Sequence, residues 1–280
     1  MENRKIIFPG RAALPLVRLA LKEDTGRGDA TASLIPPGRK GKAVIRSKGR
    51  GILCGLPLLK LVFRGVSIRV LAQDGAAVRL GKIIAELSGP LRGLLTGERT
   101  ALNFLCALSG IATLTARYVK AVRGTGAKIY DTRKTLPGLR RLAKYAVRAG
   151  GGFNHRMGLY DMVLIKDNHL AAESISRFVA RARKRRPRLA VEVEVENLRQ
   201  FREAVESRPD VIMLDNMSLK MMRRAVRLAR EMKCRAQLEA SGNVTLKNVR
   251  AVAQTGVDRI AIGAITHSAP ILDMSMEMRG

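Results

Sequence analysis

From Lys128 onward, apolar runs of strand length alternate with segments of helical pattern. The apolar runs occupy 129, 162–165, 190–195, 211–214, 236–238 and 260–262. The helical segments between them include 171–185, 198–206, 218–232 and 245–254. Repeated strand and helix units of this kind predict parallel strands that are joined by crossover helices.

Polar residues follow each of these apolar runs. In chain order they read DTRK, KDNH, EVEN, LDN, EASG and GAITHS. An open doubly wound sheet concentrates its chemistry at one switch point, whereas a barrel collects it from the ends of all its strands. We therefore predict an α/β fold with an incomplete β/α barrel of about six parallel strands, fewer than the usual eight.

The N-terminal part of the chain has a different pattern. A helical stretch at 14–21 and a polar loop at 23–36 precede short alternating strands at 41–47, 51–54, 67–72 and 82–88, with glycines between them. This pattern predicts an α/β sandwich with antiparallel pairing. A helix at 96–122 follows, with an expected break at Ser109-Gly110, and Arg99 stands out among its apolar residues. We expect a sandwich domain at 1–110, which the C-terminal tail 274–280 could join, and a barrel domain at 111–273.

Composition narrows the class of protein. Hydrophobic residues make up 46% of the 280 residues, which is ample for a buried core. The three cysteines have no paired spacing, so neither a disulfide framework nor a structural zinc site is indicated, and a cytoplasmic setting is expected. Pro15 and Arg18 interrupt the apolar N-terminal stretch, so we expect no signal peptide and no membrane span.

The charge is unusually basic, at +29. A balance of this kind raises the question of nucleic acid binding, because phosphate neutralisation supplies most non-specific affinity. However, only 181–188 is a dense basic run, which we interpret as a solvated loop, and aromatic residues are only 4% of the chain. This pattern therefore argues against nucleic acid as a partner.

The residues at the predicted strand ends sort by chemistry. Arg133, Lys134, His155, Arg156 and Lys166 form a cationic group. Two acids at the ends of neighbouring strands, Glu194 and Asp215, could hold a magnesium ion or ribose hydroxyls. Small residues after the last two strands, Ser241-Gly242 and Gly263-Ala264, are expected to expose N–H groups at helix N-termini as a phosphate site. The set predicts a phosphorylated sugar substrate and an acidic co-substrate.

Several of these residues have structural alternatives. Glu192, Glu194 and Glu196 share one face of a strand whose valines point the other way, and we expect at least one to be functional. Asp215 could instead cap the next helix. Four cations between the first two strands are expected to form a solvated helix face: Arg140, Arg141, Lys144 and Arg148.

The histidines are more informative as a group. The chain has three, and His155, His169 and His267 all fall in strand-end motifs. A single histidine would indicate little, but three at the expected barrel face are difficult to explain by packing. His169 could still be a structural hydrogen-bonding residue.

The motifs together resemble a known family. In order and spacing, TGERTALNFLCALSGIAT, the stretch 131–169, VEVEVEN, LDN, EASG and IGAITHS resemble nicotinate-nucleotide pyrophosphorylase (carboxylating), also called quinolinate phosphoribosyltransferase. The resemblance extends from about Glu23 to Asp273. It implies a sandwich domain, an incomplete barrel, and a homodimer in which one subunit's N-terminal domain faces its partner's barrel, with higher assembly left open. It also implies transfer of the phosphoribosyl group of phosphoribosyl pyrophosphate to quinolinate, with magnesium and loss of carbon dioxide, in de novo NAD synthesis.

The resemblance also implies a role for each matching residue. Arg133, His155, Arg156 and Lys166 would bind the two carboxylates of quinolinate, with Arg99 donated across the dimer interface. Lys134 and Lys166 would contact phosphoribosyl pyrophosphate, and Glu194 and Asp215 would bind ribose hydroxyls and Mg²⁺. Among these, Lys134, Lys166, Glu194 and Asp215 are the expected catalytic residues. The 5′-phosphate site would be lined by Ser241, Gly242, Gly263 and His267.

Two other functions remain open from the sequence. One is a related phosphoribosyltransferase, such as the molybdenum-transport-associated homologue or an enzyme that uses nicotinate. The complete cation set argues against it, because an acceptor with one carboxylate would not need so many cations. The other is a non-enzymatic role in nucleic acid binding, which rests on charge alone.

Overall fold

The computed structural model describes residues 7–166, 169 and 173–279. The predicted helix start at 171–172, the motif residues Asp167 and Asn168, and Gly280 of the predicted tail lie outside the described residues. The chain divides into two compact units, which are described separately. The sandwich unit holds the residues up to Ala116, Thr135–Gly151 and the segment from Ile265, and the barrel unit holds Arg117–Lys134 and Gly152–Ala264.

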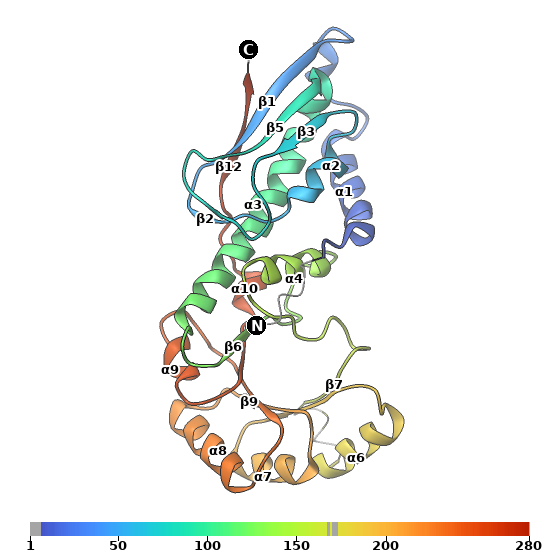
Figure 1. Cartoon of the computed structure of the whole chain (residues 1–280). Helices are drawn as coiled ribbons and strands as arrows, with labels where there is room; N and C mark the ends of the chain where they lie inside the picture. The colour runs from blue at the N-terminus through green and yellow to red at the C-terminus, as the bar shows by residue number, and fades with distance from the viewer. Residues whose placement is uncertain (1–6, 167–168, 170–172, 280) are drawn as a thin grey trace. The chain divides into compact units, whose positions relative to one another are not determined.

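The sandwich unit is built on a four-stranded antiparallel sheet (Figure 1). Its strand order is β12 (Met274–Arg279), β1 (Lys40–Ser47), β5 (Ile83–Pro90) and β3 (Ser67–Val70). A short pair, β2 (Gly51–Ile52) and β4 (Ala77–Val78), stands beside it. The helices of the unit are α1 (Gly10–Thr25), α2 (Leu59–Val62), most of α3 (Leu91–Ala121), α4 (Arg140–Ala149) and α10 (Ala264–His267), with 3-10 turns at Ala32–Leu34 and Leu56–Leu58. The predicted antiparallel sandwich is confirmed.

Helix α3 is continuous, so the predicted break at Ser109-Gly110 is wrong. The glycine serves close packing instead, because a Cβ at Gly110 would overlap the carbonyl oxygen of Pro270. Among the described residues, α3 is the one helix long and apolar enough to cross a membrane by length and composition. Its apolar residues, such as Leu102 and Leu105, are buried in the core of the sandwich unit.

The barrel unit contains a six-stranded parallel sheet, as predicted. Its order is β6 (Lys128–Tyr130), β11 (Arg259–Ala261), β10 (Gln237–Ser241), β9 (Val211–Asp215), β8 (Val191–Val195) and β7 (Val163–Ile165). Its helices are α6 (Ile175–Arg185), α7 (Leu198–Ser207), α8 (Leu219–Glu231) and α9 (Val249–Ala253). Because every strand runs in the same direction, the carboxyl ends of all six strands meet at one edge.

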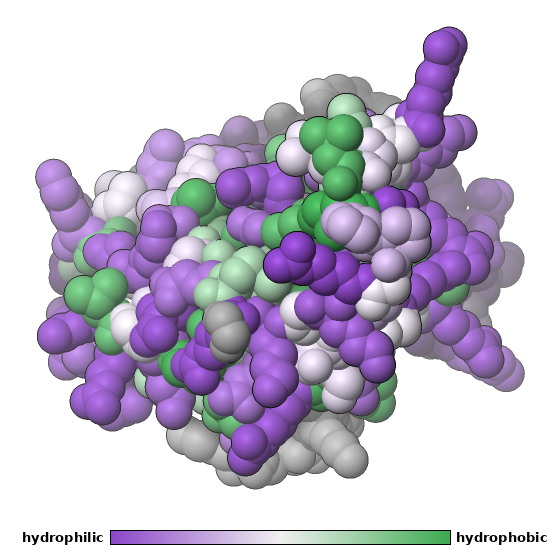
Figure 2. All heavy atoms as spheres, turned by 90° about the horizontal axis from the view of Figure 1, so that it is seen from above, coloured by the Kyte–Doolittle hydropathy of each residue, from purple (hydrophilic) through white to green (hydrophobic). Residues whose placement is uncertain are grey.

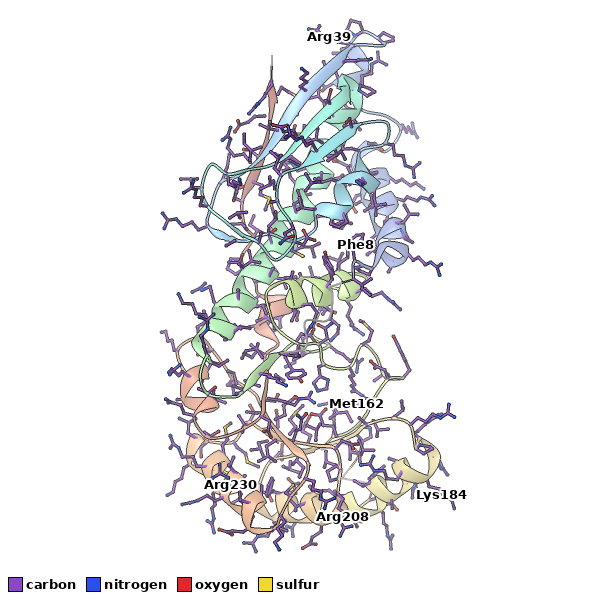
Figure 3. All side chains as sticks on the ribbon, viewed as in Figure 1. Phe8, Arg39, Met162, Lys184, Arg208 and Arg230 are labelled. Atoms are coloured by element: carbon purple, nitrogen blue, oxygen red, sulfur yellow. The ribbon has the colours of Figure 1, made fainter. Side chains whose placement is uncertain are left out.

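Part of the excess positive charge lies on the outer helices of the barrel unit. Helices α6, α7 and α8 lie side by side on one side of the parallel sheet, and their apolar residues face it (Figure 1). Lys184, Arg208 and Arg230 lie on the outer side of these elements and are exposed (Figure 3). Figure 2 is drawn from above, onto the sandwich unit, and hydrophilic residues dominate that face too. The cations on these helices therefore lie in solvent.

Several element boundaries differ from the predictions, including those of α1, of the loop at 23–36 and of α9. Helix α1 is longer than 14–21, and its last turn is closed by Gly26, whose N–H donates to Lys22 O at 2.9 Å. The loop at 23–36 contains a 3-10 turn because the Asp29 carboxylate accepts the N–H groups of Thr31 and Ala32. Helix α9 begins at Val249 and not at residue 245, so it is much shorter than predicted.

Candidate active site

Two guanidinium groups are held near each other in the barrel unit. Arg133 follows β6, and Arg156 lies in the loop before β7. Burial, and after it the charge of Arg133, lower the pKa of Arg156. The Nε of Arg133 is buried and has no hydrogen-bond partner among the described residues. Two nearby cations with an unsatisfied buried donor form a site that favours an anion.

The two loops that carry these arginines are tied together. Asp131, at the end of β6, has no exposed surface, and its carboxylate accepts the N–H of His155 at 2.9 Å. The Nδ1 atom of His155 accepts the N–H of Arg156 at 2.8 Å. The Arg156 guanidinium donates to Met162 O at 3.2 Å. The loop before β7 is therefore fixed at both its start and its end.

His155 also belongs to a buried cluster of charges. Its Nε2 lies 2.9 Å from Glu192 Oε2 and 3.4 Å from Glu239 Oε1, and Arg259 Nε lies 2.6 Å from Glu239 Oε2. Burial alone would lower the pKa of His155, but hydrogen bonding to Glu192 and Glu239 and their charges outweigh it and raise this pKa to about 9. Burial and the charge of Glu239 raise the pKa of Glu192.

The same cluster has the donor set of a metal site, because the ligand atoms of His155, Glu192 and Glu239 lie within 4.8 Å of one another. Arg259 already supplies a cation to these carboxylates, and the imidazole ring supplies a donor. We therefore assign no metal to it. Sequence reasoning missed Glu239 and Arg259 as parts of the site. The available signal was a charged residue inside each of two buried strands.

The second acid of β8 faces a lysine. Glu194 is 8% exposed, and its Oε2 lies 2.5 Å from Lys166 Nζ at the end of β7. Glu196, next on the same face, is exposed, while the alternate valines of the strand are fully buried. The pairing therefore separates the three glutamates by environment: Glu192 belongs to the charge cluster, Glu194 pairs with Lys166, and Glu196 is in solvent.

His169 acts as a local hydrogen-bonding residue. Its Nδ1 accepts the N–H of Lys166 at 3.0 Å, and its ring meets Phe178 edge-on with centroids 6.1 Å apart. Lys134 is exposed, and its N–H donates to Thr132 Oγ1 at 3.0 Å. The ends of β6 and β7 thus each present a lysine whose main chain is fixed.

The end of β9 interlocks with the end of β10. Asp215 accepts from the Asn216 amide at 2.7 Å and is not the cap of α8, which is Ser218. A Cβ at Gly242 would overlap the Asn216 amide oxygen, and Gly242 has a φ of 87°. Only glycine fits this position without strain. Ser241 pairs in register with Asp215, so the two residues lie at neighbouring strand ends.

The expected helix N-termini are only partly present. No described helix starts directly after Ser241-Gly242, because α9 begins later, at Val249. Gly263 directly precedes α10, a helix of only 4 residues. Arg99 in α3 and His267 in α10 belong to the sandwich unit, whereas the remaining predicted residues all belong to the barrel unit.

One prediction about the cations is wrong. Lys144 in α4 is 1% exposed, although it was expected on a solvated helix face. Its neighbours Leu142, Ala143 and Tyr145 are buried as well, so α4 is covered on most sides. A helix covered in this way must bury part of its polar face, and sequence periodicity does not reveal that cover.

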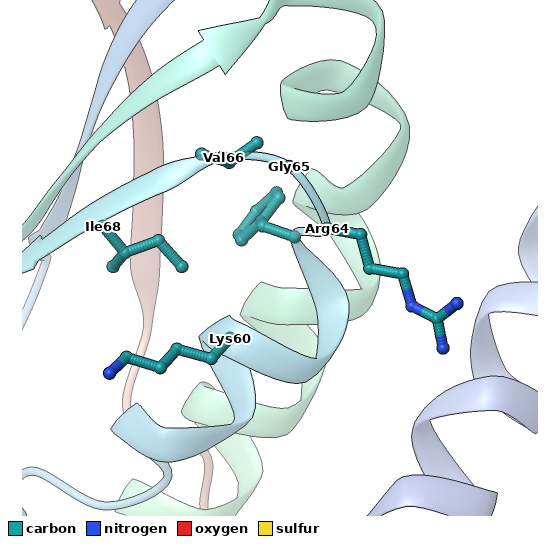
Figure 4. A pocket seen from close by; sticks show the side chains of 6 residues that line it. Lys60, Arg64, Gly65, Val66 and Ile68 are labelled. Atoms are coloured by element: carbon teal, nitrogen blue, oxygen red, sulfur yellow. The ribbon is translucent and has the colours of Figure 1, made fainter.

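Two surface depressions lie away from these residues. One, of about 360 Å³, is in the sandwich unit and is lined by Lys60, Phe63, Arg64, Gly65, Val66 and Ile68. Figure 4 shows its lysine and arginine pointing in different directions, so they do not converge on a ligand. The other, of about 430 Å³, lies beside α8 and is lined by cations such as Arg223 and Arg227. Neither contains a residue predicted for the site.

Comparisons with known proteins agree on one family. Residues 29–109 match the N-terminal domain of quinolinate phosphoribosyl transferase, and residues 111–277 match its C-terminal domain. The chain is 44% identical over 270 residues to a probable nicotinate-nucleotide pyrophosphorylase [carboxylating] of Synechocystis sp., covering 94% of this chain and 92% of the relative. It is 45% identical over 276 residues to the Mycobacterium leprae nicotinate-nucleotide pyrophosphorylase [carboxylating], covering 95% and 97%.

A solved structure supports the same relationship. The nicotinate-nucleotide pyrophosphorylase from Francisella tularensis superposes with a TM-score of 0.91 at 40% identity, over 98% of each chain. The two family domains together span most of this sequence, and the relatives match it at nearly full length. The chain therefore belongs to the quinolinate phosphoribosyl transferase family.

Proposed function

We propose that this chain is a decarboxylating quinolinate phosphoribosyltransferase. It transfers the phosphoribosyl group of phosphoribosyl pyrophosphate to quinolinate, and it forms nicotinate mononucleotide, pyrophosphate and carbon dioxide in de novo NAD synthesis. Family membership along nearly the whole chain supports the reaction. The observation that carries the assignment in this structure is the pair Arg133 and Arg156, with a buried and unsatisfied donor on Arg133.

The acidic acceptor fits the cationic part of the site. Arg133 and Arg156, with Lys166, bind the two carboxylates of quinolinate, and Arg99 reaches the same pocket from a partner subunit. His155 supports this group from behind, because its two ring nitrogens already face Glu192 and the N–H of Arg156. Each charge-assisted hydrogen bond contributes roughly 1.5–3 kcal/mol. Several such bonds are needed, because two carboxylates are costly to remove from water. The same cations stabilise electron density on the pyridine ring as carbon dioxide leaves.

The ribose half of the site uses the acids and lysines. Glu194 and Asp215 lie at the carboxyl ends of the adjacent strands β8 and β9. Their hard oxygen donors fit Mg²⁺ as well as ribose hydroxyls, so these two residues would hold the ion. The chemistry that Mg²⁺ supplies in such a site is charge neutralisation on phosphate oxygens. Lys134 and Lys166 contact the pyrophosphate group, and Lys166 exchanges its contact with Glu194 for a substrate oxygen.

The remaining assignments concern phosphate and assembly. Ser241, Gly242, Gly263 and His267 line the 5′-phosphate site, and the enzyme is a cytoplasmic homodimer with shared active sites. Displacement of pyrophosphate passes through an oxocarbenium-like state, so positioning and charge stabilisation account for most of the catalysis. No nucleic acid or membrane partner is needed for any of these steps.

The reaction is tested by measuring nicotinate mononucleotide formation with phosphoribosyl pyrophosphate and Mg²⁺, with quinolinate and nicotinate as alternative acceptors. We expect product from quinolinate alone, because the second carboxylate completes the charge balance of the cationic group. Product from nicotinate alone would instead support the related nicotinate-using activity. Product from neither acceptor would contradict both assignments.

The carboxylate assignment is tested by Arg133→Ala and Arg156→Ala. Each variant should lose at least about 1000-fold in kcat/KM with quinolinate, because a charged partner of a desolvated carboxylate is removed. Arg202→Ala, at an exposed arginine of α7, is the matched control and should keep wild-type activity. Near-normal turnover in either site variant, with the control intact, would remove the arginine pair from the site.

A further inference from the structure

The cluster of His155, Glu192, Glu239 and Arg259, here called the charge cluster, is only partly used by the roles above. Its members come from different elements of the barrel unit: the loop before β7, then β8, β10 and β11. Glu192 and Glu239 have no exposed surface, and His155 and Arg259 are 9% and 7% exposed. No substrate group can therefore touch the two carboxylates without first displacing a neighbour.

In the charge cluster, each residue holds the next one in place, from Arg259 through Glu239 to His155. Arg259 on β11 is paired in register with Glu239 on β10, and its Nε lies 2.6 Å from the Glu239 carboxylate. The guanidinium of Arg259 also lies 4.0 Å from the centre of the Tyr130 ring. The other oxygen of Glu239 lies 3.4 Å from His155 Nε2. Arg259 thus fixes Glu239, and Glu239 with Glu192 fixes the imidazole ring.

The imidazole ring of His155 connects the charge cluster to Arg156, which belongs to the anion site. Its Nε2 faces the charge cluster, and its Nδ1 accepts the N–H of Arg156 at 2.8 Å. Since Nδ1 accepts in this contact, the ring proton lies on Nε2, toward the carboxylates, and the second proton that the raised pKa of His155 implies belongs to the charge cluster as a whole and not to Nδ1. A rotation of the ring would break both contacts. It would also release the main chain of Arg156, which bears one of the two guanidiniums of the anion site.

A merely stabilising role for these charges is a poor explanation of their burial. Replacing a buried ion pair by apolar residues of similar volume is often neutral or stabilising, so stability alone does not favour a layer of four polar groups. The charged groups that face the two nitrogens of a histidine ring set its tautomer and orientation, even where the contacts are ion pairs without ideal hydrogen-bond geometry. That effect would be lost with an apolar layer.

We propose that Glu239 and Arg259 are positioning residues, which act through His155 to hold Arg156 in place for the acidic acceptor. This inference rests on the proposed function, because it names the quinolinate half of the site as the part that they organise. The ribose half is expected to be independent of them, since Lys166 pairs with Glu194 and not with a member of the charge cluster.

The kinetic test uses Glu239→Gln and Arg259→Met. Both should raise KM for quinolinate by about 10-fold or more while KM for phosphoribosyl pyrophosphate stays within about 2-fold. Arg259→Lys keeps the charge and should recover part of the loss. Glu206→Gln, at an exposed glutamate of α7, is the matched control and should change neither constant. Folded variants with an unchanged KM for quinolinate, or with equal rises in both constants, would overturn the proposal.

A second measurement does not depend on activity, and its first result comes from the wild-type protein alone. The Nε2–H of His155 in the wild-type protein should give a slowly exchanging proton NMR signal at neutral pH, because the group is buried between carboxylates. The signal should be displaced in Glu239→Gln and unchanged in Glu206→Gln. Its absence from the wild-type spectrum would overturn the positioning role. A wild-type chain that binds and converts no quinolinate would contradict the proposed function, and the ring signal would still decide how His155 is held.

Discussion

Glu192 and Glu239 are carboxylates without exposed surface, and their environment determines how this protein responds to pH. The ordinary pKa of histidine, 6.5, is raised to about 9 for His155 despite burial, because the two carboxylates favour the extra proton. Whether that proton lies on the ring or on the carboxylate pair, the folded cluster keeps it at pH values where the unfolded chain has released it.

This proton makes stability depend on pH. Its contribution should be fully present below pH 6.5 and be lost as pH rises toward about 9, because the folded state binds the proton more tightly than the unfolded state. The loss should be on the order of 3 kcal/mol in the free energy of unfolding. Urea denaturation of wild type and His155→Gln between pH 6 and pH 8.5 measures it. Equal pH slopes for the two proteins would contradict the prediction.

Single residues were predictable where their chemistry is local. The cations Arg133 and Arg156 could be named from the sequence, since they follow a buried strand and a glycine run. The partners Glu239 and Arg259 could not, because what joins them is the spacing of side chains across β10 and β11, which depends on strand register. The burial of Lys144 was also missed, because it depends on how other elements pack against α4, which the local sequence pattern does not show.

At the scale of elements, the sequence predicted correctly whether most segments are helices or strands, but it placed their first and last residues less accurately. The six parallel strands were predictable because each apolar run is bounded by polar residues. Strand β4 and the shortened α9 were not, because a strand of 2 residues or a helix of 5 leaves little periodicity to detect. The unbroken α3 shows that a glycine in a helix can mark a contact and not an end.

Helix α3 gives a direct test of that interpretation. Gly110→Ala should destabilise the protein by about 1–3 kcal/mol, because the added methyl group overlaps the Pro270 carbonyl. Gly93→Ala, in the same helix, meets no atom within 4 Å and should be neutral or stabilising by up to about 1 kcal/mol. Urea denaturation of both variants compares them. A stabilising Gly110→Ala would show that the helix tolerates the methyl group and that packing does not require the glycine.

At the scale of the whole molecule, the proposed dimer can be tested by complementation. Arg99 belongs to the sandwich unit and Arg133 to the barrel unit. If one subunit donates Arg99 to its partner's site, Arg99→Ala and Arg133→Ala should each be inactive alone. Mixed after dissociation and reassociation, they should recover about a quarter of wild-type activity, because half of the dimers are mixed and each has one intact site. No recovery, with mixed dimers demonstrated, would place Arg99 in its own chain's site.

The pairing of β12 with β1 affects how the chain is made. Ser47 pairs with Met274 and Lys42 with Arg279, so one edge of the sandwich sheet is completed by residues from the opposite end of the sequence. During synthesis, β1 emerges early and keeps that edge unpaired until residues 274–279 have been made. An open strand edge on a nascent chain invites pairing with another chain. We therefore expect chains that stop before β12 to aggregate more readily than the full chain, because the β1 edge stays unpaired in them.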